Sequence, residues 1–180
     1  MPSIQAIADA LSTTFTDERY PVGTTYVQTD NQVKSNLTGV SDLYTDANWL
    51  GKGERVWIFI KAGTGGIDGG ETVKREVAVA TTDPFVGIAS TVADSVPRLL
   101  LGVADHDIAA ASYGWIIKNG ACVFDATGGT VAAGNFLATA GAGGVVTVDA
   151  DEESPAIIGM ATEALSGSVL TNFVQGFVFL

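Results

Sequence analysis

Three features of the sequence carry residue types that could do chemistry: a lone histidine, a lone cysteine and one glycine-rich loop. His106 stands between Asp105 and Asp107 and is the single histidine of the chain. A metal site with two histidine ligands is therefore excluded, and any Ser-His-Asp or Cys-His arrangement would have to use His106. Because it lies between an apolar run and a predicted turn, we interpret it as part of a solvated turn and not as a catalytic base.

Cys122 lies in an apolar run beside Val123 and Phe124. A thiol in such surroundings behaves as a small hydrophobic group, because burial disfavours the reactive thiolate. A single cysteine also excludes an internal disulfide. We predict a core position for Cys122.

The glycine-rich loop at 63–70 does not follow the Gly-x-Gly-x-x-Gly order, and no Lys-Ser or Lys-Thr follows a glycine-rich turn. Dinucleotide and phosphate binding are therefore not supported. Asp68 gives this loop a slight likeness to a calcium repeat, and the acidic run at 149–153 is a second place where a cation could bind. We interpret that run as a solvated loop and predict no catalytic residue, no metal and no cofactor.

Composition describes a foldable chain with few charges. The 180 residues are 47% hydrophobic and 16% charged, and 9 basic residues against 20 acidic ones give a net charge of −11. Disorder is disfavoured by this hydrophobicity, and nucleic acid by the lack of clustered Lys and Arg. No Lys or Arg follows Lys118. We therefore expect neighbouring protein to cover part of the apolar surface, as in an oligomer or a lattice.

We recognise no targeting signal and no membrane-spanning segment in the sequence. The sequence carries no basic residue before Arg19, and no apolar run approaches the roughly 20 residues that a membrane-spanning helix needs. We expect a protein made soluble in the cytoplasm, without a membrane partner.

The predicted elements that would position these residues fall into two parts, residues 1–53 and residues 54–180. Residues 1–15 show the apolar spacing of one helix, and 16–53 form a polar arm with interspersed aromatic residues. The helix could pack on its own domain or on a neighbouring subunit, because a short helix needs cover from elsewhere. The candidate subunit contacts in 1–53 are Ile4, Ile7, Leu11, Phe15, Tyr20, Tyr26, Tyr44 and Trp49.

Residues 54–180 predict β-structure. Val56, Ile58 and Ile60 alternate with Trp57 and Phe59, as on the two faces of a strand. Further short apolar runs follow at 73–79, 85–89, 98–104, 113–118, 121–124, 135–139, 144–148, 156–162 and 173–180. Short runs at this spacing predict an all-β domain, a small barrel or sandwich of antiparallel strands.

The chain also repeats itself weakly. A Gly-apolar-Ala triplet recurs at Gly87, Gly102 and Gly159, and the last two are followed at nearly equal distance by Gly120 and Gly176. The segments at 119–124 and 175–180 therefore look like one element used twice. Glycine inside a strand is typical of a bulge or a bend, so we interpret these glycines as architectural.

The stretch Leu101–Gly120 resembles a pattern found in head decoration proteins of tailed bacteriophages, and similar segments follow at 130–148 and 157–164. The resemblance covers about residues 85–180. It implies a small β-barrel on the outer surface of the phage head, where a dimer or trimer clamps neighbouring major capsid proteins. It thus implies a structural virion protein and not an enzyme.

Three alternatives remain. A tail-tube, fibre or spike subunit would share the same β-rich composition. A carbohydrate- or cell-surface-binding module would use Trp49, Trp57 and Trp115 as an exposed platform. A hydrolase built on His106 is the least supported.

Overall fold

The structure is a computed structural model that describes residues 11–29, 53–77, 82–90, 99–126, 131–139, 144–148, 157–161 and 173–180. These residues form ten β-strands and no α-helix, which confirms the all-β prediction. Within the same ranges no helix is long and apolar enough to cross a membrane. Of the predicted helix at 1–15, residues 1–10 lie outside the described residues, and 11–15 are turn and coil.

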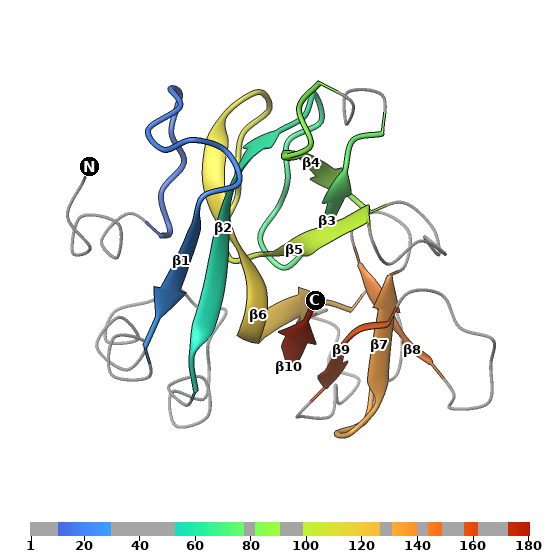
Figure 1. Cartoon of the computed structure of the whole chain (residues 1–180). Helices are drawn as coiled ribbons and strands as arrows, with labels where there is room; N and C mark the ends of the chain where they lie inside the picture. The colour runs from blue at the N-terminus through green and yellow to red at the C-terminus, as the bar shows by residue number, and fades with distance from the viewer. Residues whose placement is uncertain are drawn as a thin grey trace.

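The strands vary from four to thirteen residues, and Figure 1 shows their arrangement. Their bounds are β1 Thr25–Gln28, β2 Arg55–Ala62, β3 Thr72–Arg75, β4 Val86–Ala89, β5 Leu100–Ala104, β6 Tyr113–Asp125, β7 Phe136–Thr139, β8 Val145–Val148, β9 Ile157–Ala161 and β10 Phe173–Phe179.

Five of the strands close into a barrel. The strands β2, β4, β3, β5 and β6 are neighbours in that order, and β6 pairs back onto β2. All of these pairings are antiparallel except β2 with β4, which run parallel at Lys61 and Ala62. Closure satisfies the backbone groups of both edges that an open five-stranded sheet would expose.

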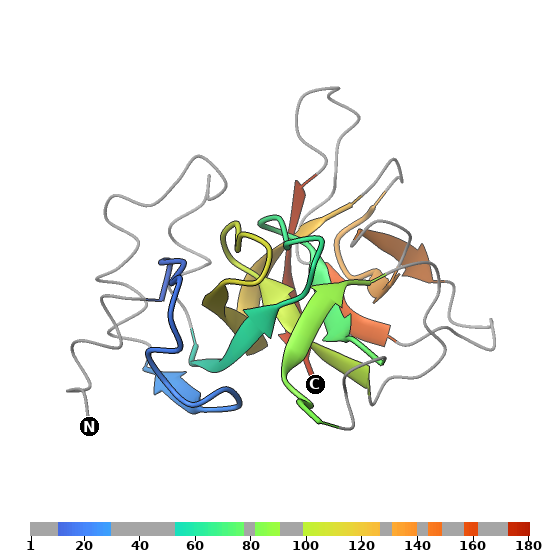
Figure 2. The same ribbon diagram turned by 90° about the horizontal axis from the view of Figure 1, so that it is seen from above.

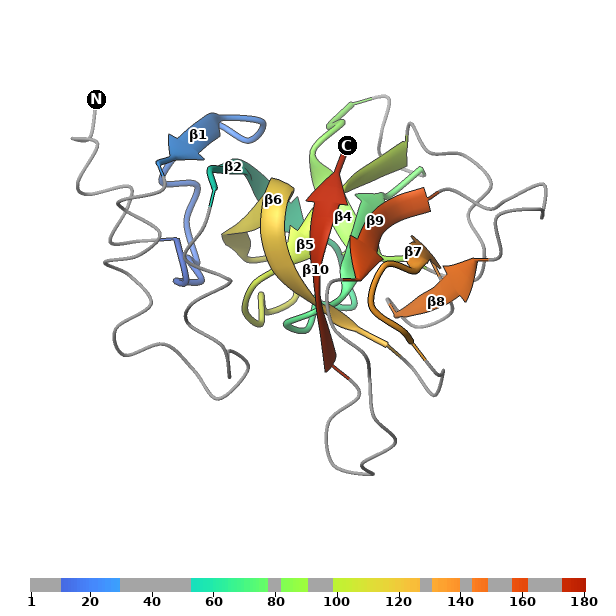
Figure 3. The same cartoon turned by 90° about the horizontal axis from the view of Figure 1, so that it is seen from below.

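The longest strand, β6, belongs to two parts of the sheet. Its first half pairs with β2 and β5, and its second half pairs with β10. Gly120 stands between the halves with φ of 111°, and a Cβ there would press on the carbonyl oxygen of Glu54. Only glycine combines this backbone with this close approach. Figure 3 shows β6 curving from β2 toward β10.

The strands beyond this bend repeat the strands before it. The sheet order is β4-β3-β5-β6 followed by β10-β9-β7-β8, so each strand of the first unit has a counterpart in the second. The irregularities match as well. A register shift occurs in β3 at Val73, which pairs with Gly102, and another occurs in β7 at Leu137, which pairs with Gly159. Residues 57–62 and 67–75 thus correspond one to one with residues 121–126 and 131–139, and the second half of β6 takes the place of β2.

The loops between the corresponding strands share their hydrogen bonds. The N–H groups of Gly70 and Gly134 donate to the carbonyl oxygens of Ala104 and Ala161, each at 2.8 Å. The Ala104 and Ala161 N–H groups in turn donate to Glu71 and Asn135, each at 2.9 Å. Two segments with so little sequence in common share this detail because the chain contains one β-unit twice.

The interiors of the two units correspond residue by residue. Ile60, Ala62, Ile67 and Val73 are buried in the first unit. Their counterparts are buried in a second cluster: Phe124, Ala126, Val131 and Leu137. Large and small side chains therefore alternate in the same order in both interiors.

The repeat predicted from the sequence is confirmed at Gly102 and Gly159 and wrong at the second glycine of each pair. Val103 pairs with Ile117 in the first unit, and Met160 pairs with Phe177 in the second. In this register Ile117 is the counterpart of Phe177. An alignment that superposed Gly120 on Gly176 would be shifted from it by four residues. The strands β6 and β10 are equivalent, but their glycines bend them at different points.

The two units differ where the first one closes. In the first unit Lys61 N–H donates to the Phe85 carbonyl at 3.1 Å, which joins β2 to β4. The corresponding N–H, that of Asp125, donates to the Gly70 carbonyl of the first unit at 2.8 Å. Among the described residues no backbone hydrogen bond joins β6 to β8. As far as the described residues show it, the second unit is therefore an open sheet that ends at β8.

Candidate functional site

The segment ahead of β1 is packed onto the first barrel. Phe15 and Tyr113 exchange backbone hydrogen bonds of 2.8 Å in both directions. The ring of Tyr20 lies edge-on to Phe59, with 5.2 Å between centroids, and 5.3 Å from that of Trp115. Figure 2 shows this segment and β1 at one end of the molecule, opposite β7 and β8.

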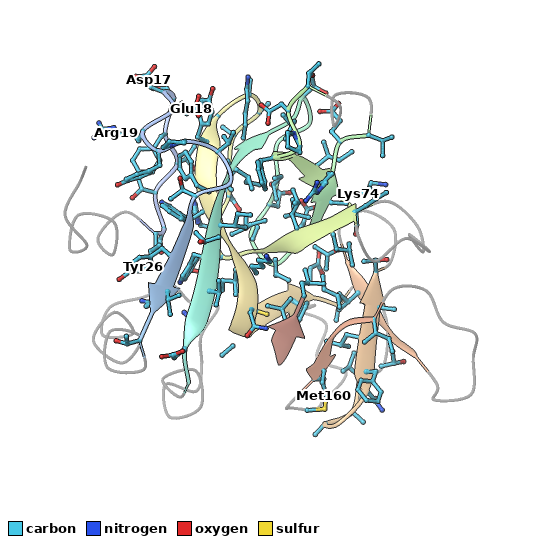
Figure 4. The ribbon with its side chains drawn as sticks, viewed as in Figure 1. Asp17, Glu18, Arg19, Tyr26, Lys74 and Met160 are labelled. Atoms are coloured by element: carbon cyan, nitrogen blue, oxygen red, sulfur yellow. The ribbon has the colours of Figure 1, made fainter. Side chains whose placement is uncertain are left out.

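This packing places four of the candidate contact residues inside the chain's own core. Leu11, Tyr20 and Tyr26 are buried, and Phe15 is half-buried against the same cluster. Figure 4 shows Tyr26 on β1, whereas Asp17, Glu18 and Arg19 lie in the preceding loop. That these residues contact another subunit stays a prediction. Ile4, Ile7, Tyr44 and Trp49 lie outside the described residues, as does the acidic run at 149–153.

The strand β1 extends the sheet beyond the barrel. It pairs with β2 on one side, and the Trp57 indole donates to the side-chain oxygen of Gln28 at 3.0 Å in the interior. Thr25 and Val27 face outward, and Val27 is 49% exposed. At the other end of the sheet, β8 pairs with β7 alone among the described strands. Within the described part of the chain, the sheet therefore ends in two edge strands, β1 and β8, at which strand addition is possible.

The tryptophan platform expected of a carbohydrate-binding module is not formed by the tryptophans that the structure describes. Trp57 and Trp115 are 1% and 0% exposed. Both rings are used in the aromatic core, which leaves no face for a sugar. The carbohydrate alternative is wrong for these two residues, and Trp49 lies outside the described residues.

The Asp105-His106-Asp107 motif is more buried than a solvated turn would be. Oδ1 of Asp105 and both ring nitrogens of His106 are buried, and in the described part of the chain they have no hydrogen-bond partner of normal geometry. Burial raises the pKa of Asp105 to about 7. Burial also lowers the pKa of His106, against the opposing effects of Asp107 and of the nearby Thr13 carbonyl. The interpretation of a solvated turn holds only for Asp107, which is exposed.

Asp107 ties the turn to the glycine-rich loop. Its Oδ1 accepts a hydrogen bond of 2.8 Å from the Gly69 N–H, and its backbone carbonyl accepts one of 2.7 Å from the Thr14 hydroxyl. A single aspartate thus joins the N-terminal segment, the loop at 63–70 and the β5–β6 turn. The two hydrogen bonds give Asp107 a structural role.

Several carboxylates gather around this loop. Burial raises the pKa of Glu71, and the charges of Asp68, Asp125 and Asp107 add to the rise, whereas a hydrogen bond from the Asp68 N–H opposes it. Burial and Asp68 likewise raise the pKa of Asp125. No three His, Cys, Asp or Glu side chains in the described ranges are placed to hold a metal ion. The carboxylates of this cluster therefore repel one another when they are ionised.

Cys122 lies in the interior of β6, as the sequence predicts. Burial raises the pKa of its thiol, and Arg55 opposes the rise. Arg55 is itself buried, which lowers its pKa to about 10. The thiol is thus protonated and inert at neutral pH.

One groove combines charge with exposed apolar surface, and sequence reasoning missed it. Arg75 at the end of β3 and Lys118 in β6 both line it, together with Ile157 of β9 and Leu180. These residues are far apart in the sequence and share no motif. The fold alone brings them together, by placing β3, β6 and the start of β9 around one hollow.

Comparison with solved structures gives a partial likeness. No protein-family model and no curated protein matches the sequence. Among solved structures, the chain is similar to the head fiber gp8.5 N base of bacteriophage phi29, with a TM-score of 0.49 and 16% sequence identity. The match covers 69% of this chain and 94% of that chain. A likeness of this size does not show a family.

Proposed function

We propose that this chain is a structural subunit of a tailed-phage virion, and more specifically a decoration or cement subunit on the outer surface of the head. The observation that carries the proposal is the place of the decoration-like stretch Leu101–Gly120 in the fold. It forms most of β5, the turn after it and the first half of β6, which is one wall of the closed barrel.

The architecture suits such a subunit. A lattice protein must bind neighbours through the surfaces that its own fold leaves available, which are edge strands and exposed apolar side chains. The edge strands β1 and β8 stand at opposite ends of the sheet. Exposed apolar residues accompany both, with Val27 on β1 and Phe136 opposite Val148 of β8. A subunit with two such ends can contact two neighbours at once.

Its partners, on this proposal, are the major capsid protein and further copies of itself as a dimer or trimer, and its location is the capsid surface. The test is cosedimentation of the purified protein with expanded capsids that lack it. Saturable binding in proportion to the capsid lattice, with a raised melting temperature of the capsid, is the expected result. Capsids that sediment without the protein would contradict it.

The fibre, tail-tube or spike alternative is kept because the same sheet could assemble along an axis. The partial likeness to a head fiber base does not decide between the two. Electron microscopy of the purified protein separates them, since a fibre, tube or spike subunit forms rings or elongated particles by itself, and a decoration subunit forms compact dimers or trimers.

A further inference from the structure

The groove lined by Arg75 and Lys118 is an open hollow of about 560 Å³. Its walls come from both halves of the duplicated sheet: Leu100 belongs to β5, and Ile157 holds the corresponding position in β9. Both residues lie at the register shifts of their strands. The shift interrupts the regular alternation of faces, and this directs neighbouring residues such as Leu100 and Leu101 toward the same hollow.

The charge of the groove is opposite to that of the chain. Two of the 9 basic residues of the chain, Arg75 and Lys118, line the groove, and no Asp or Glu is among the described residues that line it. The guanidinium of Arg75 lies 5.6 Å from the centre of the Phe85 ring, which holds it in place. Arg75 Nε is buried and has no hydrogen-bond partner among the described residues. A buried donor without an acceptor is costly, so an acceptor supplied by a ligand would be favoured.

The remaining lining is apolar and partly uncovered. Ile157 and Leu180 are each 37% exposed, and they are two of the five large hydrophobic residues exposed in the described part of the chain. The volume falls within the range of roughly 300–1,000 Å³ that is typical of ligand sites. The occupant must therefore bring both a negative charge and apolar groups.

We propose that this groove binds an extended segment of a partner protein in which a carboxylate side chain lies between apolar residues. The carboxylate would accept hydrogen bonds from Arg75 and form an ion pair with Lys118. The apolar residues on either side of it in the partner segment would cover Ile157 and Leu180. A nucleic acid is disfavoured, because two cations on a chain of charge −11 cannot offset the repulsion of a phosphate backbone. The inference does not depend on the assignment to a virion.

The test uses the full-length chain and two short fluorescein-labelled peptides, one with Glu alternating with Val and one with Gln in place of Glu. Fluorescence anisotropy gives their dissociation constants at low and high salt. We expect the Glu peptide to bind more tightly than the Gln peptide, and the difference to shrink at high salt because the charges are screened. Binding of both peptides with equal affinity, or of neither, would overturn the proposal.

Variants locate the site. Arg75→Gln and Lys118→Gln should each weaken binding of the Glu peptide about tenfold, as expected for loss of one charge-assisted contact. Lys61→Gln removes the same charge outside the groove, where Lys61 lies over the Tyr113 ring, and should leave the affinity unchanged. Equal weakening by all three variants would show a long-range charge effect and overturn the site. Arg75→Lys is the conservative variant, because it keeps the positive charge. Circular dichroism checks that each variant is folded.

The outcome is separable from that of the capsid assay. A protein that binds capsids but not the Glu peptide keeps the proposed function and loses the groove. A protein that binds the peptide but not capsids keeps the groove and loses the decoration assignment.

Discussion

Gly70 and Gly134 occupy the same position in two copies of one β-unit. Their φ angles are 87° and 85°, and each donates its N–H to an alanine carbonyl at 2.8 Å. The left-handed conformation starts the turn that leads into β3 in the first unit and β7 in the second. The same backbone requirement, met twice by glycine, is strong evidence for an internal duplication.

Gly134→Ala should destabilise the protein by about 1 kcal/mol, because a Cβ is strained at positive φ. The space around Gly134 is open, so no contact adds to this strain. Gly65→Ala is the matched control, since Gly65 also faces open space and has no positive φ. There alanine should stabilise slightly, by reducing the entropy of the unfolded chain. Urea unfolding of both variants measures the difference, and equal effects would contradict the argument.

Gly102→Ala should be the more damaging substitution, for a steric reason. A Cβ at Gly102 would press on the backbone carbonyl of Ile117 in the paired strand β6, which cannot move away without opening the barrel. We expect a loss of about 3 kcal/mol, at the upper end for overpacking. Thermal unfolding gives the value, and a melting temperature equal to that of the wild type would show that β5 is not so closely packed on β6.

The sequence predicted part of this architecture because some of its signals are local. The alternation in β2 follows from the period of two residues in a strand, and the Gly-apolar-Ala triplets at Gly102 and Gly159 follow from the bulge. Both patterns are therefore visible in the sequence itself. The full duplication is not. Corresponding core positions hold different residues in the two units, with Ile60 matched by Phe124 and Val73 by Leu137. These residues are buried alike, but the sequence identity between the units is lost. Matching registers and hydrogen bonds exist only once the chain has folded.

The candidate sites were less predictable still. The exposure of a tryptophan side chain or of a turn depends on which other segments of the chain pack against it. Trp57 hydrogen-bonds Gln28, and His106 lies beside Thr13, in a segment that the sequence predicted as the end of a helix and the start of an arm. Arg75 and Lys118 line one groove only because β3 and β6 lie in one closed barrel, and no spacing rule connects them.

Tyr20→Ala tests whether the segment ahead of β1 belongs to the fold. The ring is buried against Phe59 and Trp115, so its removal leaves a cavity in the aromatic core. We expect a loss of about 3 kcal/mol, the lower end for removal of a buried aromatic side chain. Thr16→Ala, at an exposed position of the same segment, should change the stability by less than about 0.5 kcal/mol. Urea unfolding distinguishes a docked segment from a free arm, for which both variants would behave alike.

Asp105 should make the protein less stable as the pH rises. Its folded pKa of about 7 lies above the unfolded value of about 3.9, because burial disfavours the charged form. The stability that this group contributes is fully present below about pH 4 and is lost as the pH rises through about 7. The raised pKa values of Glu71 and Asp125 act in the same direction. The lowered pKa of His106 acts in the opposite one, favouring folding as the pH rises toward 6.5.

Asp105→Asn isolates this contribution, because asparagine has nearly the shape of the neutral acid and cannot ionise. The variant should match the wild type near pH 4 and exceed its free energy of unfolding at pH 8 by on the order of a few kcal/mol. Asp17→Asn removes a carboxylate at an exposed position and should leave the pH profile unchanged. Urea unfolding at several pH values gives the three profiles. If the Asp105→Asn profile ran parallel to that of the wild type, the carboxyl group would be ionised in the folded protein without penalty, and the buried position of its Oδ1 would have to be revised.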